Sequence, residues 1–229
     1  MRELFELCGA DPQVVFSPYC WRVRLALAYK ELDFVSRPIR FSDKALIGFS
    51  NQQLVPVLRD GEQVTNDSLA ILQYLDATHA QAPAVGDDLA YSRLRLLDSL
   101  FAPMRIGLFK HLILRIYAAI ADEDRTYFRE SRERNLGTTL EAFADEAGGR
   151  AQFCQALAPV SSVLGKQPYL DGERPGAADF LLGGLFFWAW SLGSAPWAED
   201  AAASAWFQRL LERCEAQHGA VRRFQPAGA

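Results

Sequence analysis

The chain has 229 residues, of which 50% are hydrophobic and 23% are charged, and its formal net charge is −4. This is the composition of a soluble globular protein with a sizeable core, and it lacks the clustered basic charge of nucleic-acid-binding proteins. The apolar runs are too short to cross a bilayer, and the charged N-terminus is not a signal peptide, so we expect a cytoplasmic protein without membrane association. The four cysteines form no CxxC pair, and the three histidines lie far apart, so no metal site is expected.

The first elements are a predicted strand over residues 2–7 and a predicted helix over residues 18–31. Ser17 precedes Pro18, and these are preferred residues at the cap and at the first position of a helix. The same helix end carries unpaired amide protons and a partial positive charge, which attract anions. Ser17 is therefore either an ordinary helix cap or a hydroxyl donor to an anionic ligand such as a thiolate.

A second strand is predicted over residues 33–39, followed by an irregular polar segment over 40–53. Two short apolar runs then flank Asp60-Gly61, which is a strong signal for a β-hairpin. Asn66-Asp67-Ser68 offers capping side chains for a helix that begins near Leu69. These elements predict a small mixed α/β module.

The composition changes over residues 78–88, which read as a linker, and the remaining chain shows only helical patterns. We expect a long helical stretch over 89–120 that is bent near Pro103 and Gly107. The next predicted helical stretches are 123–146, 150–165, 177–191 and 202–217. The 177–191 stretch is almost wholly apolar, which predicts a central helix that is buried on every side.

Four local motifs in this order resemble those of the glutathione S-transferase family. They are, in chain order, Ser17-Pro18-Tyr19-Cys20, Val55-Pro56, Asp67-Ser68 and Gly172…Gly176-Ala177-Ala178-Asp179. The resemblance covers the whole chain. It implies a fold of the α/β plus all-α class, with a thioredoxin-like domain at 1–79 and a helical domain at 88–222. It also implies a homodimer that uses glutathione as co-substrate, needs no metal and acts on a small hydrophobic electrophile.

The resemblance also implies roles for individual residues. Ser17 would donate a hydrogen bond to the glutathione sulfur, and Val55 would present its backbone to the ligand beside a cis Pro56. Asp67 and Ser68 would hold the γ-glutamyl end of glutathione, although both also suit simple helix capping. Two cations of the irregular segment are candidates for the glycyl carboxylate, or are solvated surface charges: Arg40 and Lys44. Cys20 is expected to be a small buried residue.

The second substrate is expected against the first long helix of the helical part. Met104 and Leu108 belong to an apolar stripe there, together with Phe101 and His111. Such a stripe is more often core than pocket. Tyr19 lies one position inside the first helix, where it either assists Ser17, lines the pocket or packs on the surface.

Within the family, the chain looks closest to the fungal-type branch that includes bacterial glutathione-dependent β-aryl etherases. Two features carry this likeness: Trp21-Arg22 after the active-site turn, and the stretch from Asp124 to Glu141. Conjugation is the expected function. The alternatives are glutathione-dependent ether cleavage and a non-catalytic member that binds ligands or a protein partner through the same fold. One departure is Gly176, which stands where the family's capping motif has serine or threonine and leaves Asp179 to cap from within the helix.

Overall fold

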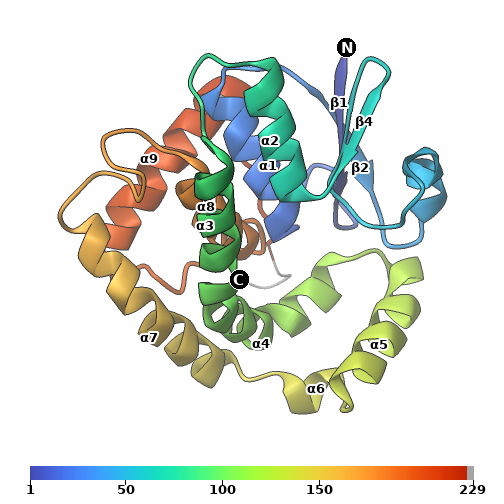
Figure 1. Cartoon of the computed structure of the whole chain (residues 1–229). Helices are drawn as coiled ribbons and strands as arrows, with labels where there is room; N and C mark the ends of the chain where they lie inside the picture. The colour runs from blue at the N-terminus through green and yellow to red at the C-terminus, as the bar shows by residue number, and fades with distance from the viewer. Residues whose placement is uncertain (226–229) are drawn as a thin grey trace.

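The computed structural model describes residues 1–225, in which a small sheet with its helices is followed by a helical part (Figure 1). The sheet has the strand order β2-β1-β3-β4. Strands β1 and β2 are parallel, while β1–β3 and β3–β4 are antiparallel. The strands are β1 Arg2–Leu7, β2 Val35–Ile39, β3 Val57–Asp60 and β4 Gln63–Asn66.

Two helices and a 3₁₀ helix cover the two faces of this sheet. Helices α1 (Pro18–Tyr29) and α2 (Ser68–Thr78) lie side by side on one face, and η1 (Lys44–Ser50) lies toward the other (Figure 1). Leu4 packs in the core beneath the helices, whereas the next residue, Phe5, joins Ile47 of η1 in a separate cluster. This alternation follows from the two-residue period of a strand.

The helical part contains the helices α3 to α9. The stretch over 89–120, predicted as one bent helical segment, forms two separate helices, α3 and α4. The structure ends α3 at Leu100 and begins α4 at Ala102, because Pro103 occupies the first turn of α4, where its missing N–H is tolerated. The bounds are α3 Asp88–Leu100, α4 Ala102–Ala119, α5 Asp122–Leu136, α6 Leu140–Phe143, α7 Glu146–Leu164, α8 Ala177–Ser191 and α9 Ala201–His218.

The predicted helical stretch over 123–146 is also divided, into α5, α6 and the start of α7. Gly137 adopts a φ of 69° and ends α5 in the left-handed conformation that glycine tolerates best. Thr139 then caps α6 and Asp145 caps α7 through their side-chain oxygens. A composition rich in charged residues concealed these breaks, because capping residues are themselves polar.

Helix α8 is the central helix of the molecule, as its apolar sequence predicts, and all its residues except Trp190 are buried. Asp179 caps it from the third position by accepting a hydrogen bond from the Gly176 amide at 3.1 Å, and Trp206 donates to the same carboxylate at 2.7 Å. A Cβ at Gly176 would meet the Asp171 carboxylate at 2.3 Å. Serine or threonine at this position would have to displace the Asp171 carboxylate, which accepts a hydrogen bond from the Ala178 amide at 3.0 Å.

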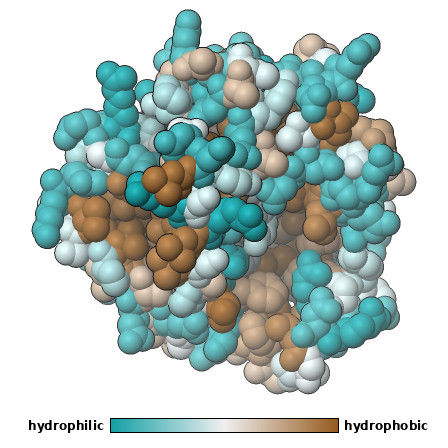
Figure 2. Space-filling view, viewed as in Figure 1, coloured by the Kyte–Doolittle hydropathy of each residue, from teal (hydrophilic) through white to brown (hydrophobic). Residues whose placement is uncertain are grey.

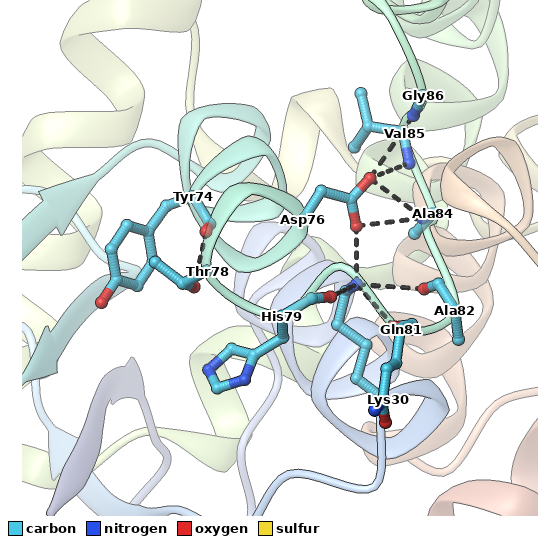
Figure 3. A network of polar contacts seen from close by, with 10 residues as sticks. All are labelled: Lys30, Tyr74, Asp76, Thr78, His79, Gln81, Ala82, Ala84, Val85 and Gly86. Atoms are coloured by element: carbon cyan, nitrogen blue, oxygen red, sulfur yellow. Dashed lines mark hydrogen bonds and ion pairs between the residues drawn. The ribbon is translucent and has the colours of Figure 1, made fainter.

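The linker between the two parts is held by a buried polar network at the ends of α1 and α2 (Figure 3). Lys30 Nζ contacts the Asp76 carboxylate at 2.7 Å and donates to the carbonyls of His79 and Ala82 at 2.9 and 3.0 Å. Asp76 in turn accepts hydrogen bonds from the amides of Ala84 and Val85. The segment that the sequence marks as a linker is thus fixed by side chains of the first part.

Candidate active site

A cavity of about 660 Å³ lies between the sheet part and the helical part, and most of its wall is apolar. The space-filling view shows a hollow between the two parts with hydrophobic side chains in its depth (Figure 2). Its lining from the first part includes Phe16, Ser17, Tyr19, Arg40, Phe41, Lys44 and Val55. Its lining from the helical part includes Arg105, Ile106, Phe109, Tyr127, Phe128, Arg132, Phe143 and Trp188.

Ser17 stands at the cavity wall, at the N-terminus of α1. Its backbone is extended, with φ −75° and ψ 126°, and its Oγ accepts a hydrogen bond from the Cys20 amide at 3.4 Å. The side chain is therefore a helix cap. A serine hydroxyl has one donor and two acceptor sites. Capping uses an acceptor site and leaves the hydroxyl proton for an anion in the cavity, so the two interpretations of Ser17 are compatible.

The turn that carries Ser17 is supported from behind by α8. A Cβ at Gly184 would meet the Pro18 carbonyl oxygen at 2.3 Å, so only glycine permits this approach of α8 to the start of α1. Trp21 packs on Phe187 with ring centroids 4.5 Å apart, and its indole N–H donates to the Val15 carbonyl at 3.0 Å. These contacts fix the position of Ser17 through rigid elements.

Two neighbours of Ser17 in the turn behave differently from each other. Tyr19 is 37% exposed and lines the cavity, with the Arg22 guanidinium 4.7 Å from its ring centroid. Cys20 is fully buried, and desolvation raises the pKa of its thiol to about 12. A thiol with this pKa stays protonated at neutral pH, so Cys20 is a packing residue and not a nucleophile.

The residues expected to bind glutathione lie at one end of the β3–β4 hairpin. Val55 lines the cavity, and its bond to Pro56 is cis, as the resemblance implies. Because Val57 pairs with Asn66, the adjoining Pro56 and Asp67 lie at the same hairpin end. Asp67 is exposed and Ser68 is 2% exposed; Pro56, Asp67 and Ser68 are outside the described lining of the cavity.

Asp67 is the N-cap of α2. Its Oδ1 accepts hydrogen bonds from the amides of Leu69 and Ala70 at 2.9 and 3.2 Å, and its φ is 69°. The capping role expected from the sequence is therefore present. Its role toward glutathione, like that of Val55 and Ser68, stays a prediction.

The structure places Met104 and Leu108 in the core, which corrects their place as possible pocket residues and agrees with the expectation that such a stripe is more often core. They are 2% and 0% exposed, whereas Ile106 and Phe109 of the same helix line the cavity. A displacement of one or two residues turns a helical side chain by 100° or more, so the adjacent face of α4 meets the cavity. His111, on the core face, bonds the Glu146 carbonyl and Ser194 Oγ at 2.8 Å each.

Arg40 and Lys44 both line the cavity and link the first part to α5. Arg40 pairs with Glu123 at 2.6 Å, and Lys44 Nζ bonds the Tyr127 hydroxyl at 2.5 Å. Sequence reasoning missed Arg132 and the aromatic residues of α5 and α6 in the wall. The amphipathic pattern of this stretch and its likeness to the fungal-type branch do not say which of its side chains face the cavity.

Two family models match most of the chain. The model described as "Glutathione S-transferase, N-terminal domain" matches residues 12–83, and that described as "Glutathione S-transferase, C-terminal domain" matches residues 97–216, more than half of the chain. The chain belongs to the glutathione S-transferase family.

Solved glutathione transferases share the fold over nearly the whole length. Glutathione transferase GSTFuA3 from Phanerochaete chrysosporium superposes with a TM-score of 0.81 at 22% identity, covering 93% of this chain and 96% of that one. The Ceriporiopsis subvermispora enzyme CsGST63524, solved in complex with glutathione, gives 0.81 at 18% identity, covering 95% and 97%. The predicted thioredoxin-like and helical architecture is confirmed.

Related sequences match over shorter spans. A probable maleylacetoacetate isomerase of Vibrio cholerae is 39% identical over 70 residues, which are 28% of this chain and 33% of that protein. Glutathione S-transferase Z2 of Arabidopsis thaliana is 32% identical over 140 residues, which are 56% of this chain and 61% of that protein. The matched regions thus span between a third and about three-fifths of these relatives.

Two kinds of feature are absent from residues 1–225. We find no cluster of three or more histidine, cysteine, aspartate or glutamate residues arranged to hold a metal ion. None of the helices in that range combines the length and the apolar character that crossing a membrane requires.

Proposed function

We propose that this glutathione S-transferase conjugates the glutathione thiolate to a small hydrophobic electrophile. The observation that carries the proposal is the place of Ser17, whose hydroxyl stands at the N-terminus of α1 and at the wall of a largely apolar cavity. Ser17 is the proposed catalytic residue. Val55, Pro56, Asp67 and Ser68 are the proposed glutathione-binding residues, with the two domains bounded at 1–79 and 88–222.

The chemistry requires that the glutathione thiol be ionised at neutral pH. A free thiol with a pKa of ~8.5 is only about 3% thiolate at pH 7. Lowering that pKa by about two units makes most of it thiolate and needs about 2.7 kcal/mol of selective stabilisation. One hydrogen bond from Ser17 to the charged sulfur contributes roughly 1.5–3 kcal/mol, and the α1 amides and dipole add to it.

Cleavage of aryl ethers is the second candidate, and the wall of the cavity favours an aryl substrate in either case. Phe41, Phe109, Phe128, Phe143 and Trp188 all contribute aromatic rings to it. In ether cleavage the thiolate would form a C–S bond while an aryloxide leaves as the anion. In conjugation of an aryl halide the leaving group is halide.

We further propose that the protein is a cytoplasmic homodimer. Leu89, Leu96 and Leu100 recur on one face of α3 and are 57%, 62% and 62% exposed. Figure 2 shows hydrophobic patches among hydrophilic side chains on the face of the molecule where α3 lies. An apolar helix face of this kind suits a second copy of the chain. The cysteines are unpaired, as a reducing compartment requires.

A panel assay tests the proposed function. Turnover with glutathione is measured with aryl halides, with aryl ethers and with maleylacetoacetate, the compound in the name of the Vibrio cholerae relative. Product analysis separates conjugation, ether cleavage and isomerisation. Calorimetry with glutathione accompanies it. Absence of glutathione binding at millimolar concentration would reject the proposal, while binding without any turnover would favour the non-catalytic ligand-binding alternative.

A further inference from the structure

The charged residues in the cavity wall are all cations. Four cations from different segments of the chain line it: Arg40, Lys44, Arg105 and Arg132. No aspartate or glutamate is among the described lining residues. A mostly apolar wall with one sign of charge concentrates the field on the occupant. Arg40 and Lys44 are the candidates for the glycyl carboxylate of glutathione, which leaves Arg105 and Arg132 without an assigned occupant.

Three of these cations already have partners within the chain. Arg40 pairs with Glu123 at 2.6 Å, and Lys44 donates to the Tyr127 hydroxyl at 2.5 Å. Arg105 lies 3.6 Å from the Asp98 carboxylate. Arg40 thus has a counter-ion and Lys44 has a neutral hydroxyl partner, while the carboxylate near Arg105 is shared with Arg22.

Arg132 differs from the other three. Within residues 1–225 neither Lys44 nor Arg132 has a carboxylate within 4 Å. Lys44 donates to a hydroxyl of another element, whereas the side-chain hydrogen bond of Arg132 goes to the adjacent Ser131 Oγ at 3.2 Å. Its guanidinium lies instead over two aromatic rings, 5.0 Å from the Phe128 centroid and 5.5 Å from that of Phe41. Burial lowers the pKa of this guanidinium. A half-buried cation without a counter-ion at a cavity wall is a place where an anion gains more than it would in water.

We infer that Arg132 binds an anionic group of the second substrate, and that this substrate is an aryl carboxylate. The inference rests on the proposed function and names the substrate class of the same site. The planar guanidinium matches a carboxylate with two parallel hydrogen bonds. The guanidinium lies over the faces of Phe41 and Phe128, and the aromatic wall accommodates the aryl ring.

The reaction on such a substrate leaves the carboxylate unchanged. The glutathione sulfur attacks the ring carbon that bears the leaving group, forming the C–S bond with the thiolate electron pair. The bond to the leaving group then breaks, and halide or aryloxide departs with its bonding pair. Arg132 is thus a positioning and specificity residue, because it acts on a group remote from the reacting atoms.

The test uses a chloronitrobenzoate and the chloronitrobenzamide of the same substitution pattern, each with saturating glutathione. We expect wild type to prefer the carboxylate over the amide relative to the uncatalysed reaction, and Arg132→Gln to reduce that preference about tenfold to a hundredfold. The reduction should appear in the KM for the carboxylate. Arg134→Gln is the matched control, since Arg134 is an exposed arginine of the same helix. Arg132→Lys should show an intermediate preference for the carboxylate, because lysine keeps the positive charge but cannot form the two parallel hydrogen bonds of a guanidinium.

The outcome separates this inference from the proposed function. Binding of the non-reacting nitrobenzoate and nitrobenzamide is measured by calorimetry in the presence of S-methylglutathione. Carboxylate binding that depends on Arg132 supports the inference even if no conjugation occurs. Equal turnover of the carboxylate and the amide by wild type would overturn the inference while leaving conjugation established. This comparison uses wild-type protein alone, so it does not depend on a variant that folds. A rise confined to the KM for glutathione in Arg132→Gln would also overturn it, by assigning Arg132 to the co-substrate.

Discussion

Lys30 Nζ lies 2.7 Å from Asp76 Oδ1, and this ion pair joins the C-terminal ends of α1 and α2. The Lys30 side chain is only 1% exposed and that of Asp76 12%. Each partner also bonds the backbone of the linker, as Figure 3 shows. The pair therefore ties the backbone of the linker to the ends of both helices of the first part.

Replacing one partner of the pair should be costly. We expect Asp76→Asn to lower the free energy of unfolding by about 3–5 kcal/mol, because it leaves the buried Lys30 ammonium without a counter-ion. Asp87→Asn is the control, since Asp87 is an exposed helix cap and asparagine caps equally well. Urea unfolding followed by circular dichroism measures both. A loss no larger than that of the control would mean that the pair contributes little.

The same pair should make stability depend on pH in the acid range. Burial acts to raise the pKa of Asp76, but the hydrogen bonds from Lys30, Ala84 and Val85 outweigh it and lower the pKa below 3.8. A carboxylate with a lowered folded-state pKa stabilises the fold above its unfolded pKa, and this contribution is lost as pH falls through the folded value. The difference in unfolding free energy between wild type and Asp76→Asn should therefore be constant above about pH 5 and shrink below pH 3.8. A difference that is flat with pH would contradict the assignment.

The parts of the site that sequence predicts well are those that depend on local chemistry. Ser17 before Pro18 and Asp67 before α2 are visible as caps because the capping oxygen and its amides lie within three residues. The face of α4 that lines the cavity cannot be predicted from local sequence. Apolar residues occur on more than one face of α4, so Met104 and Ile106 give the same sequence signal. Only the packing of α7 and α8 against α4 determines which of the two is buried in the core and which lines the cavity. Arg132 shows the same limit, since its neighbour Phe41 is distant in sequence.

The role of Ser17 can be measured on the bound thiol. We expect Ser17→Ala to raise the pKa of enzyme-bound glutathione by about one to two units, which corresponds to the loss of one hydrogen bond to a charged group. Turnover should fall at neutral pH and partly recover above the pKa of a free thiol, ~8.5. The loss of the α1 cap should also lower stability by about 1 kcal/mol. The measurement is the ultraviolet absorbance of the thiolate in the complex as a function of pH.

Tyr19→Phe is the control for Ser17, because Tyr19 is the other hydroxyl of the turn that lines the cavity. We expect it to shift the thiol pKa less than Ser17→Ala does. A shift in Tyr19→Phe with none in Ser17→Ala would transfer the role to Tyr19. No shift in either variant would leave the amides of α1 as the stabiliser and Ser17 as a cap.

Asp67 has a capping function and a proposed binding function, and two substitutions separate them. Asp67→Asn keeps a capping oxygen but removes the charge, so we expect near wild-type stability with weaker glutathione binding. Asp67→Ala should also lose about 0.5–2 kcal/mol of stability. Because Asp67 would contact the end of glutathione remote from sulfur, the thiol pKa and the turnover at saturating glutathione should hardly change. Calorimetry and thermal unfolding distinguish the two effects. Unchanged affinity in both variants would reduce Asp67 to a cap.

The two faces of α4 offer a final comparison of pocket and core. Ile106 is 48% exposed and lines the cavity, whereas Met104 is 2% exposed and packs in the core. We expect Ile106→Ala to raise the KM for an apolar electrophile about threefold to tenfold with little change in stability, since it removes contact area that only the substrate covers. Met104→Ala should instead lower the free energy of unfolding by about 2–5 kcal/mol through the cavity it creates, with the KM for the electrophile nearly unchanged at a temperature where it stays folded. Steady-state kinetics and urea unfolding on both variants give the answer. If the kinetic effect appeared in Met104→Ala and not in Ile106→Ala, the substrate would lie against the face that the sequence stripe first indicated, and α4 would have to turn on binding.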